Sequence, residues 1–387
     1  MNILSIETSC DETAVSIIEA NGGLEHPHFK ILGNVLFSQI EIHREYGGVF
    51  PMLAKREHAK NLPALLAHAF KEAKMYNENG NLDETVWMKL STILLREEGL
   101  CDGLKPLFGK MTKPQIDIIA VTVGPGLEPA LWVGISCAKA LGTLWDIPVI
   151  PTNHMEGHIV SVLAESEDTR QVNFPALALL VSGGHTELVS MPAWGQYKTI
   201  GQTRDDAVGE AFDKVARQLG LPYPGGPEIS KLAHIARTEN IPHTVELPRP
   251  MINSNDCDFS FSGLKTAVLY YIRDHEPLSE NDKADIAREF EDATVEVLMS
   301  KTKKALDLTG ARTLIIGGGV IANKKLRDTS LMLEKEYPDL IVKTPTHSLS
   351  TDNALMVACA AYMDTCLHPE KITSPVEPIA NGNLKLG

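Results

Sequence analysis

The stretch ILSIETSCDETAVSI (residues 3–17) sets the pattern of the chain. A short apolar run is followed by a small, polar turn and then by a second run rich in β-branched and small residues. That order predicts two antiparallel strands joined by a turn. The stretch LALLVSGGHTELVS (residues 177–190) repeats the order about half a chain later. A repeat at this spacing indicates a duplicated domain, although two unrelated hairpins would give the same pattern.

The segments outside these hairpins alternate between strand and helix patterns. A buried strand over residues 116–123, the turn GPG, a helix over 129–145 and a strand at 149–150 make a βαβ unit with parallel pairing. The other elements that we expect are a strand at 313–316 and helices over residues 57–73, 207–219, 285–306 and 350–366. Ser350 or Thr351 is the expected N-cap of the last helix.

These patterns predict an α/β protein of two lobes, in keeping with its 387 residues and a domain size of about 150 residues. We expect an N-terminal lobe over residues 1–152 and a C-terminal lobe over 153–349, with the helix 350–366 packing back near the first lobe. Residues 77–110 lack a comparable pattern, and we expect them to be an insertion rather than part of the core.

Composition excludes several classes of protein. Hydrophobic residues make up 43% and charged residues 22%, which is ordinary for a globular chain. The net charge of −14 argues against a protein that coats nucleic acid by bulk charge. The six cysteines form no CxxC pair, and there is neither a signal peptide pattern nor an apolar run of about 18 residues. We therefore expect a cytoplasmic protein with free thiols and no membrane contact.

The segment NHMEGH (residues 153–158) carries two histidines at helical spacing. In a helix His154 and His158 lie on one face, where both imidazoles can bind one metal ion. The zinc protease pattern is HExxH, whereas Glu156 stands two residues after the first histidine and points away from that face. We therefore predict a metal site and exclude a protease. Asp352 is a candidate third ligand, although helix capping alone would explain a carboxylate at that place.

Glycine-rich turns form a second group. They are SGGH (182–185), GG (225–226) and GGG (317–319), and each follows or joins apolar segments. Glycine allows close approach of the backbone to a phosphate or nucleoside. None of the turns is a P-loop or a dinucleotide-binding fingerprint. Together they favour nucleotide binding.

Eight segments, in this order and over nearly the whole chain, resemble the TsaD/Kae/Qri family, most closely its bacterial TsaD branch. They are ETSCDET (7–13), GPGL (124–127), NHMEGH (153–158), VSGGHT (181–186), DDAVGEAFDK (205–214), DFSFSGLK (258–265), GGGV (317–320) with Asn323, and TDNA (351–354). The resemblance implies an actin/Hsp70-like (ASKHA) fold of two duplicated lobes with mixed sheets flanked by helices.

The resemblance also implies an activity. This is transfer of a threonylcarbamoyl group from threonylcarbamoyl-AMP to N6 of adenosine 37 in tRNAs that read ANN codons. It implies one divalent metal ion, iron(II) ahead of zinc, held by His154, His158 and Asp352. The expected partners are TsaB-like and TsaE-like proteins. The residues implied to contact the adenylate are Val181, Ser182, Gly183, Gly184, His185, Asp213, Gly226 and Asn323.

The residues leave two further points open. Asp11 or Glu12, in the first turn, is the candidate base for the proton of the attacking amine, and a solvated turn carboxylate is the alternative. Of the basic clusters, residues 301–304 are expected to be a solvated helix face, and residues 324–327 are the expected tRNA contact.

The competing function is an actin-like ATP-binding or ATPase scaffold, which would not need the two histidines.

Overall fold

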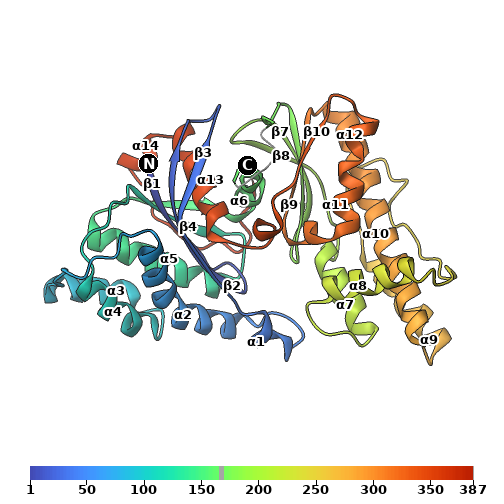
Figure 1. Ribbon diagram of the computed structural model, residues 1–387, viewed down its shortest axis with the longest axis horizontal. Coiled ribbons are helices and arrows are strands. Elements are labelled where there is room, and N and C mark those ends of the chain that lie inside the picture. Colours follow the sequence, from blue (N-terminus) through green and yellow to red (C-terminus); the bar gives the residue numbers. More distant parts are fainter. Residues whose placement is uncertain (165–169, 387) are drawn as a thin grey trace. The chain divides into compact units, whose positions relative to one another are not determined.

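The computed structural model describes residues 1–164 and 170–386 (Figure 1). The chain forms two compact units. The first combines Met1–Ser166 with Asp352–Leu386, and the second is Glu167–Thr351. The expected lobe boundary at residue 152 precedes the histidine segment, whereas this division assigns that segment to the first unit. The reason is packing, because the helix that carries the histidines contacts the last long helix of the same unit.

The first unit is built on a five-stranded mixed sheet. Its strands are β1 (Asn2–Glu7), β2 (Glu12–Asn21), β3 (His28–Ser38), β4 (Ile118–Gly124) and β5 (Val149–Asn153), in the order β3-β2-β1-β4-β5. β1 to β3 pair antiparallel, and β1, β4 and β5 pair parallel. The predicted hairpin is therefore β1–β2, and the predicted βαβ unit is β4–α5–β5.

Helices cover both faces of this sheet. The helices of this unit are α1 (Ile40–Arg44), α2 (Pro51–Glu72), α3 (Glu84–Leu94), α4 (Leu100–Lys110), α5 (Glu128–Trp145), α6 (His154–Val160), α13 (Ala354–Leu367) and α14 (Glu370–Thr373). Leu4 and Ile6 of β1 belong to the core shared with α2 and α5. Ser5, between them, donates to the carbonyl oxygen of Ala354 in α13 at 2.7 Å. Since successive side chains of a strand alternate between faces, α13 covers the opposite face.

The prediction that residues 77–110 lie outside the core is wrong. Within this segment α3 and α4 bury Leu90, Leu94, Leu100 and Leu104, and all four are fully inaccessible members of the core around α2 and α5. The two helices are amphipathic, and an apolar stripe is stable only when it packs against another apolar surface. α3 packs against α5, and α4 packs against α2.

The second unit repeats the architecture of the first. Its strands are β6 (Ala176–Val181), β7 (Thr186–Ala193), β8 (Gln196–Gln202), β9 (Thr313–Gly317) and β10 (Ile341–Lys343), in the order β10-β9-β6-β7-β8. β6 pairs antiparallel with β7 and parallel with β9. Read from the other edge, this is the order and sense of the first sheet. The described parts of the chain thus show the duplicated two-lobe α/β fold that the repeat predicted.

The helices of the second unit gather around one core. They are α7 (Val208–Gln218), α8 (Gly225–Thr238), α9 (Ser262–His275), α10 (Glu280–Thr309), α11 (Lys324–Leu331) and α12 (Leu333–Glu336). Single 3-10 turns occupy Ser161–Leu163 in the first unit and Gly319–Ala322 and His347–Leu349 in the second. The long helix α10 begins with a capping box, in which Ser279 and Asp282 bond each other's backbone N–H groups.

Candidate metal and catalytic site

The short helix α6 holds both predicted histidines on one face. Asn153 caps it, since its side chain accepts from the backbone N–H of Met155 at 2.9 Å. His154 is 6% exposed and His158 is 0% exposed. Their ring centroids are 4.7 Å apart and the rings are nearly perpendicular, at 84°. The predicted spacing of one helical turn is therefore confirmed.

Asp352 completes the group from the segment before α13. Its Oδ1 lies 3.4 Å from Nε2 of His154 and 3.2 Å from Nε2 of His158. One ligand atom from each of the three residues falls within 4.8 Å of the others. The expectation that Ser350 or Thr351 caps this helix is wrong, because the side chain of Asn353 accepts from the N–H of Met356 at 2.9 Å. With Asn353 as the cap, the Asp352 carboxylate is available to the histidines.

The three residues fit a divalent metal ion. Two imidazoles and one carboxylate are a donor set for iron or zinc. Both ring nitrogens of His158 are buried without a hydrogen-bond partner among the described residues, although Nε2 is close to Asp352. Buried polar atoms are normally paired. An ion held by the two histidines and Asp352 would supply a partner for Nε2 of His158.

Glu7 at the end of β1 fixes the orientation of His154. Its carboxylate is completely buried, with Oε2 3.3 Å from Nδ1 of His154 and 2.5 Å from the Oγ1 of Thr122, which donates to it. The backbone N–H of Ser9 donates to Oε1 at 2.6 Å. The Oγ of Ser9 is also 3.3 Å from Nδ1 of His154. Because Glu7 occupies the Nδ1 side, the Nε2 side of the ring faces Asp352.

Electrostatics at this group favour positive charge. Burial opposes the charged form of His154, but the carboxylates of Asp352 and Glu7 outweigh it and hold the pKa of His154 well above its usual value. Burial likewise tends to raise the pKa of Asp352, and the neighbouring histidines, His154 above all, lower it strongly. A cluster that stabilises charge in this way is a common feature of functional sites.

Asp11 and Glu12, the candidate bases, lie at the turn between β1 and β2. Both are nearly buried, at 8% and 7% exposure. The Oγ of Ser38 donates to Glu12 Oε1 at 3.1 Å. Burial first, and then the charges of Asp11 and Asp352, raise the pKa of Glu12 well above its usual value. A carboxylate that resists ionisation is a stronger base once it is ionised, which suits Glu12 to this role.

The predicted adenylate contacts at Val181–His185 lie at the carboxyl end of β6 in the second unit, beside the turn that follows β9. After Val181, Ser182 closes a turn by donating its N–H to the carbonyl of His185 at 2.9 Å. Gly183 and Gly184 are exposed in this turn. Gly318, after β9, has a φ of +94°, and a Cβ there would lie 2.4 Å from the carbonyl oxygen of Val181. Only glycine permits this close approach of the two turns.

Hydrogen bonds connect the remaining predicted contacts. Asp213 of α7 accepts from the N–H of Gly225 at 2.7 Å, directly before Gly226 at the start of α8. The side-chain amide of Asn323 donates to Ser230 Oγ on α8 at 2.7 Å. Asn323 also donates to Glu291 at 2.7 Å and caps α11 through Leu326. The structure thus brings Asp213, Gly226 and Asn323 onto connected elements.

Some site residues escape sequence reasoning. Glu7 ends a buried strand, and a carboxylate in such a strand was the available signal. Nothing in the local pattern marks Thr122 or Ser230 as the partner of a site residue.

The expectation for residues 301–304 needs correction. The ammonium group of Lys301 is not solvated, since the residue is 0% exposed and Nζ donates to Ser254 Oγ at 2.6 Å and to the carbonyl of Asp256 at 2.9 Å. Lys304 donates to the carbonyl of Ser254 at 2.8 Å. These lysines hold the loop before α9 to α10.

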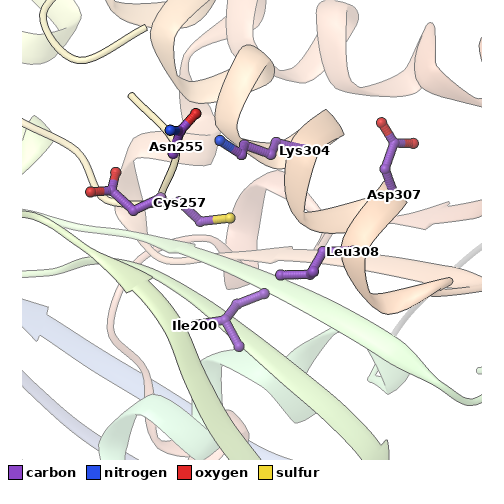
Figure 2. A pocket seen from close by; sticks show the side chains of 7 residues that line it. Ile200, Asn255, Cys257, Lys304, Asp307 and Leu308 are labelled. Atoms are coloured by element: carbon purple, nitrogen blue, oxygen red, sulfur yellow. The ribbon is translucent and has the colours of Figure 1, made fainter. Parts of the chain in front are cut away.

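A cavity of about 400 Å³ adjoins this lysine-bound loop (Figure 2). In the close-up, the Lys304 side chain extends toward the loop residues Asn255 and Cys257. Two carboxylates and no predicted site residue line the cavity, so it is separate from the candidate nucleotide contacts. Its lining residues are Ile200, Asn255, Asp256, Cys257, Lys304, Asp307 and Leu308.

Fold and site together define a duplicated two-lobe α/β protein of the actin/Hsp70-like (ASKHA) class with a His–His–Asp group in its first unit. A family model described as TsaD, tRNA N6-adenosine threonylcarbamoyltransferase, matches residues 30–81 and 108–359. A "tRNA N6-adenosine threonylcarbamoyltransferase" of Paraburkholderia xenovorans (strain LB400) is 43% identical over 365 residues, which are 94% of this chain and 92% of that protein. The chain belongs to the TsaD family of transferases.

A solved structure of low sequence identity shares the fold. Full-length HypF in its phosphate- and nucleotide-bound form superposes with a TM-score of 0.53 at 12% identity, covering 95% of this chain and 56% of that chain. T. kodakarensis HypF gives a TM-score of 0.49 at 14% identity, covering 70% of this chain and 44% of that chain. Among the described residues, no helix is both long and apolar enough to cross a membrane.

Proposed function

We propose that this chain transfers the threonylcarbamoyl group of threonylcarbamoyl-AMP to N6 of adenosine 37 in tRNAs that read ANN codons. The observation that carries the proposal is a relative of this activity at 43% identity over 94% of the chain. The His–His–Asp group supports it, because a scaffold that only binds ATP has no need of such a group. The tRNA substrate implies action in the cytoplasm.

In this proposal His154, His158 and Asp352 hold one divalent ion, iron(II) ahead of zinc. When bound, such an ion polarises a carbonyl oxygen as a Lewis acid and orients the donor. Glu7 keeps Nε2 of His154 turned toward Asp352, and its carboxylate, 3.3 Å from Nδ1, stabilises a proton on that nitrogen.

The turns of the second unit are the proposed adenylate site. The turn at Ser182–His185 suits the phosphate, because Gly183 and Gly184 are exposed and carry no side chain that would block its approach. Asp213 is the proposed partner of the ribose hydroxyls. Gly226 and Asn323 complete the site on α8 and at the start of α11.

The reaction needs one proton acceptor. N6 of adenosine attacks the carbamoyl carbon, the N–C bond forms, and the bond from that carbon to the phosphate oxygen breaks to release AMP. The amine proton passes to a base, and we propose Glu12 for this role. N6 is a weak nucleophile because its lone pair is delocalised into the ring, so positioning and proton removal carry the step.

The test is to incubate the chain with threonylcarbamoyl-AMP and unmodified tRNA, with and without TsaB-like and TsaE-like partners. Mass spectrometry of the digested tRNA then detects the modified nucleoside. Formation of threonylcarbamoyladenosine supports the proposal. ATP hydrolysis without any modified nucleoside, under all conditions, would instead support a nucleotide-binding scaffold.

A further inference from the structure

We propose that Tyr46 and Phe50 form a platform on which unpaired bases of the tRNA stack. The inference rests on the proposed function, for which it supplies a substrate contact in the first unit. N6 of adenine donates a hydrogen bond in a Watson–Crick pair, and an enzyme that acts on a base atom takes the base out of the paired stack. Proteins that recognise unpaired bases stack them on aromatic side chains.

The two rings are unusually exposed for aromatic side chains. Tyr46 is 63% and Phe50 is 54% exposed, and Met52, two residues after Phe50, is 59% exposed. The rings are inclined by only 24° with centroids 6.2 Å apart. Both belong to the connection between α1 and α2, and Phe50 is the N-cap residue of α2. Exposed apolar groups gathered in one place indicate a binding surface.

Buried polar side chains tie this platform to the turn that carries the candidate base. The backbone N–H of Phe50 donates to Nδ1 of His43 at 3.4 Å. Nε2 of His43 lies 3.2 Å from Oε1 of Gln39, whose Nε2 lies 3.2 Å from Nδ1 of His58. Gln39, His43 and His58 are all fully buried. Such a satisfied network holds its members in one arrangement.

The other end of the network reaches the first turn directly. Nδ1 of His58 is 2.7 Å from Thr13 Oγ1, next to Glu12 in the chain. The backbone N–H of Gln39 donates to the carbonyl of Asp11 at 2.9 Å. The platform is therefore held in a fixed position relative to Glu12, the candidate catalytic base. A platform that stacks a nucleobase near the reacting adenosine has to be positioned in this way.

Charge along α2 favours a nucleic acid over an apolar protein surface as the occupant. Met52, Arg56 and Lys60 are exposed and spaced by four residues, so they share one face of the helix. Within the described residues Arg56 forms no ion pair, and Lys60 pairs with Glu57 at 3.2 Å. Aromatic rings followed by basic side chains are the usual composition of a single-strand contact.

The experiment measures tRNA affinity by filter binding with unmodified tRNA, without donor or turnover, in the presence of any partner that the unaltered chain requires. The variants are Tyr46→Ala, Phe50→Ala and Phe50→Tyr. The matched control is Tyr270→Ala, which removes a 52% exposed tyrosine from α9 in the second unit. We expect each alanine variant to weaken binding by roughly 5- to 150-fold, the loss of one base–aromatic stack. We expect Phe50→Tyr and Tyr270→Ala to bind like the unaltered chain.

Salt dependence separates stacking from charge. Phe50→Ala should leave the slope of log affinity against log salt unchanged, whereas Arg56→Ala should reduce it by about 1 if Arg56 contacts a phosphate. Unchanged tRNA affinity of both alanine variants would overturn the inference. The inference would also be overturned if Tyr270→Ala weakened tRNA binding as much as the platform variants do, or if the platform variants lost a protein partner but kept their tRNA affinity. If the platform variants bind tRNA more weakly as expected but the unaltered chain transfers no threonylcarbamoyl group, the proposed function fails and the platform does not.

Discussion

The polar residues around His154 divide into groups that can hold a cation and groups that orient the imidazole. Nε2 of His158 and Oδ1 of Asp352 lie 3.2 Å apart and are close enough to bind one ion. Glu7 instead bonds the far nitrogen of His154 and is itself held by Thr122 and Ser9. Outer carboxylates of this kind raise the basicity of a ligating histidine and set which nitrogen is protonated.

His158→Ala removes one of the three candidate ligands and should abolish metal binding. Metal content would be measured beside the circular dichroism spectrum.

We expect Glu7→Gln to lower the affinity for the metal ion by about 10- to 100-fold, because an amide stabilises the protonated Nδ1 less well than a carboxylate. The dissociation constant of the metal ion would be measured beside the circular dichroism spectrum. The control is Glu19→Gln, a half-exposed carboxylate on β2. If Glu7→Gln binds the metal ion as tightly as the unaltered chain, Glu7 has only a structural role. If its metal affinity is lower, excess metal should restore transfer by the variant.

Glu12→Gln should lower kcat by about 10²- to 10⁴-fold, the usual contribution of a general base, with tRNA affinity retained. Because the pKa of Glu12 is raised, the carboxylate ionises only as pH rises above the usual range of a glutamate, and kcat should rise over that interval. The acidic limb of the kcat–pH profile should be missing in the variant. A profile identical to that of the unaltered chain would instead direct attention to Asp11.

The stability of the same variant gives an independent check with a definite sign. A carboxyl whose pKa is raised in the folded state stabilises the fold below its unfolded pKa, and that contribution is lost as pH rises through the folded pKa. Glutamine does not ionise. The free energy of unfolding of Glu12→Gln should therefore fall less than that of the unaltered chain between acidic and neutral pH.

At the level of secondary structure, α3 and α4 are the part of the first unit that is least expected from the family. The family model leaves residues 82–107 unmatched. Even so, the leucines of these helices share one core with α2 and α5. A helical hairpin that is inserted into a fold can extend the existing core when its apolar stripe packs against the outer faces of other helices and removes both surfaces from water.

Adjacent leucines in this hairpin provide a matched test. Leu94 is 0% exposed and its neighbour Leu95 is 83% exposed. Leu94→Ala should lower the free energy of unfolding by about 2–5 kcal/mol, and Leu95→Ala should change it by less than about 0.5 kcal/mol. Urea denaturation followed by circular dichroism would measure both. Equal, small effects would mean that the hairpin contributes little to the core.

For the whole molecule, charge sets how it meets its polyanionic substrate. The net charge of −14 repels tRNA at long range, so binding depends on local groups. Of the cluster that sequence offered as a tRNA contact, Lys325 pairs with Asp292 at 3.1 Å and Arg327 donates to Thr344 and the carbonyl of Pro345. Lys324 is the exposed member.

We therefore expect the isolated chain to bind tRNA weakly at physiological salt, and partner proteins to strengthen binding. Filter binding with and without TsaB-like and TsaE-like proteins checks this, and the salt slope reports how many phosphates are contacted. Tight binding and repeated turnover by the chain alone would show that local contacts suffice despite the net charge.

The sequence by itself determined the two hairpins, the βαβ unit, the main helices, the duplication and the spacing of His154 and His158. These features follow from periodicities of two and 3.6 residues and from glycine turns, which are local properties of the chain.

Only the tertiary structure decided which distant groups meet. Glu7 and His154 are 147 residues apart. Asp352 reaches the histidines because Asn353 takes the capping role. Likewise Lys301 is buried and α3 and α4 join the core, although their local patterns suit a solvated face and an insertion. Such contacts depend on which surfaces remain to be covered after the sheets and helices pack, and local sequence does not encode that.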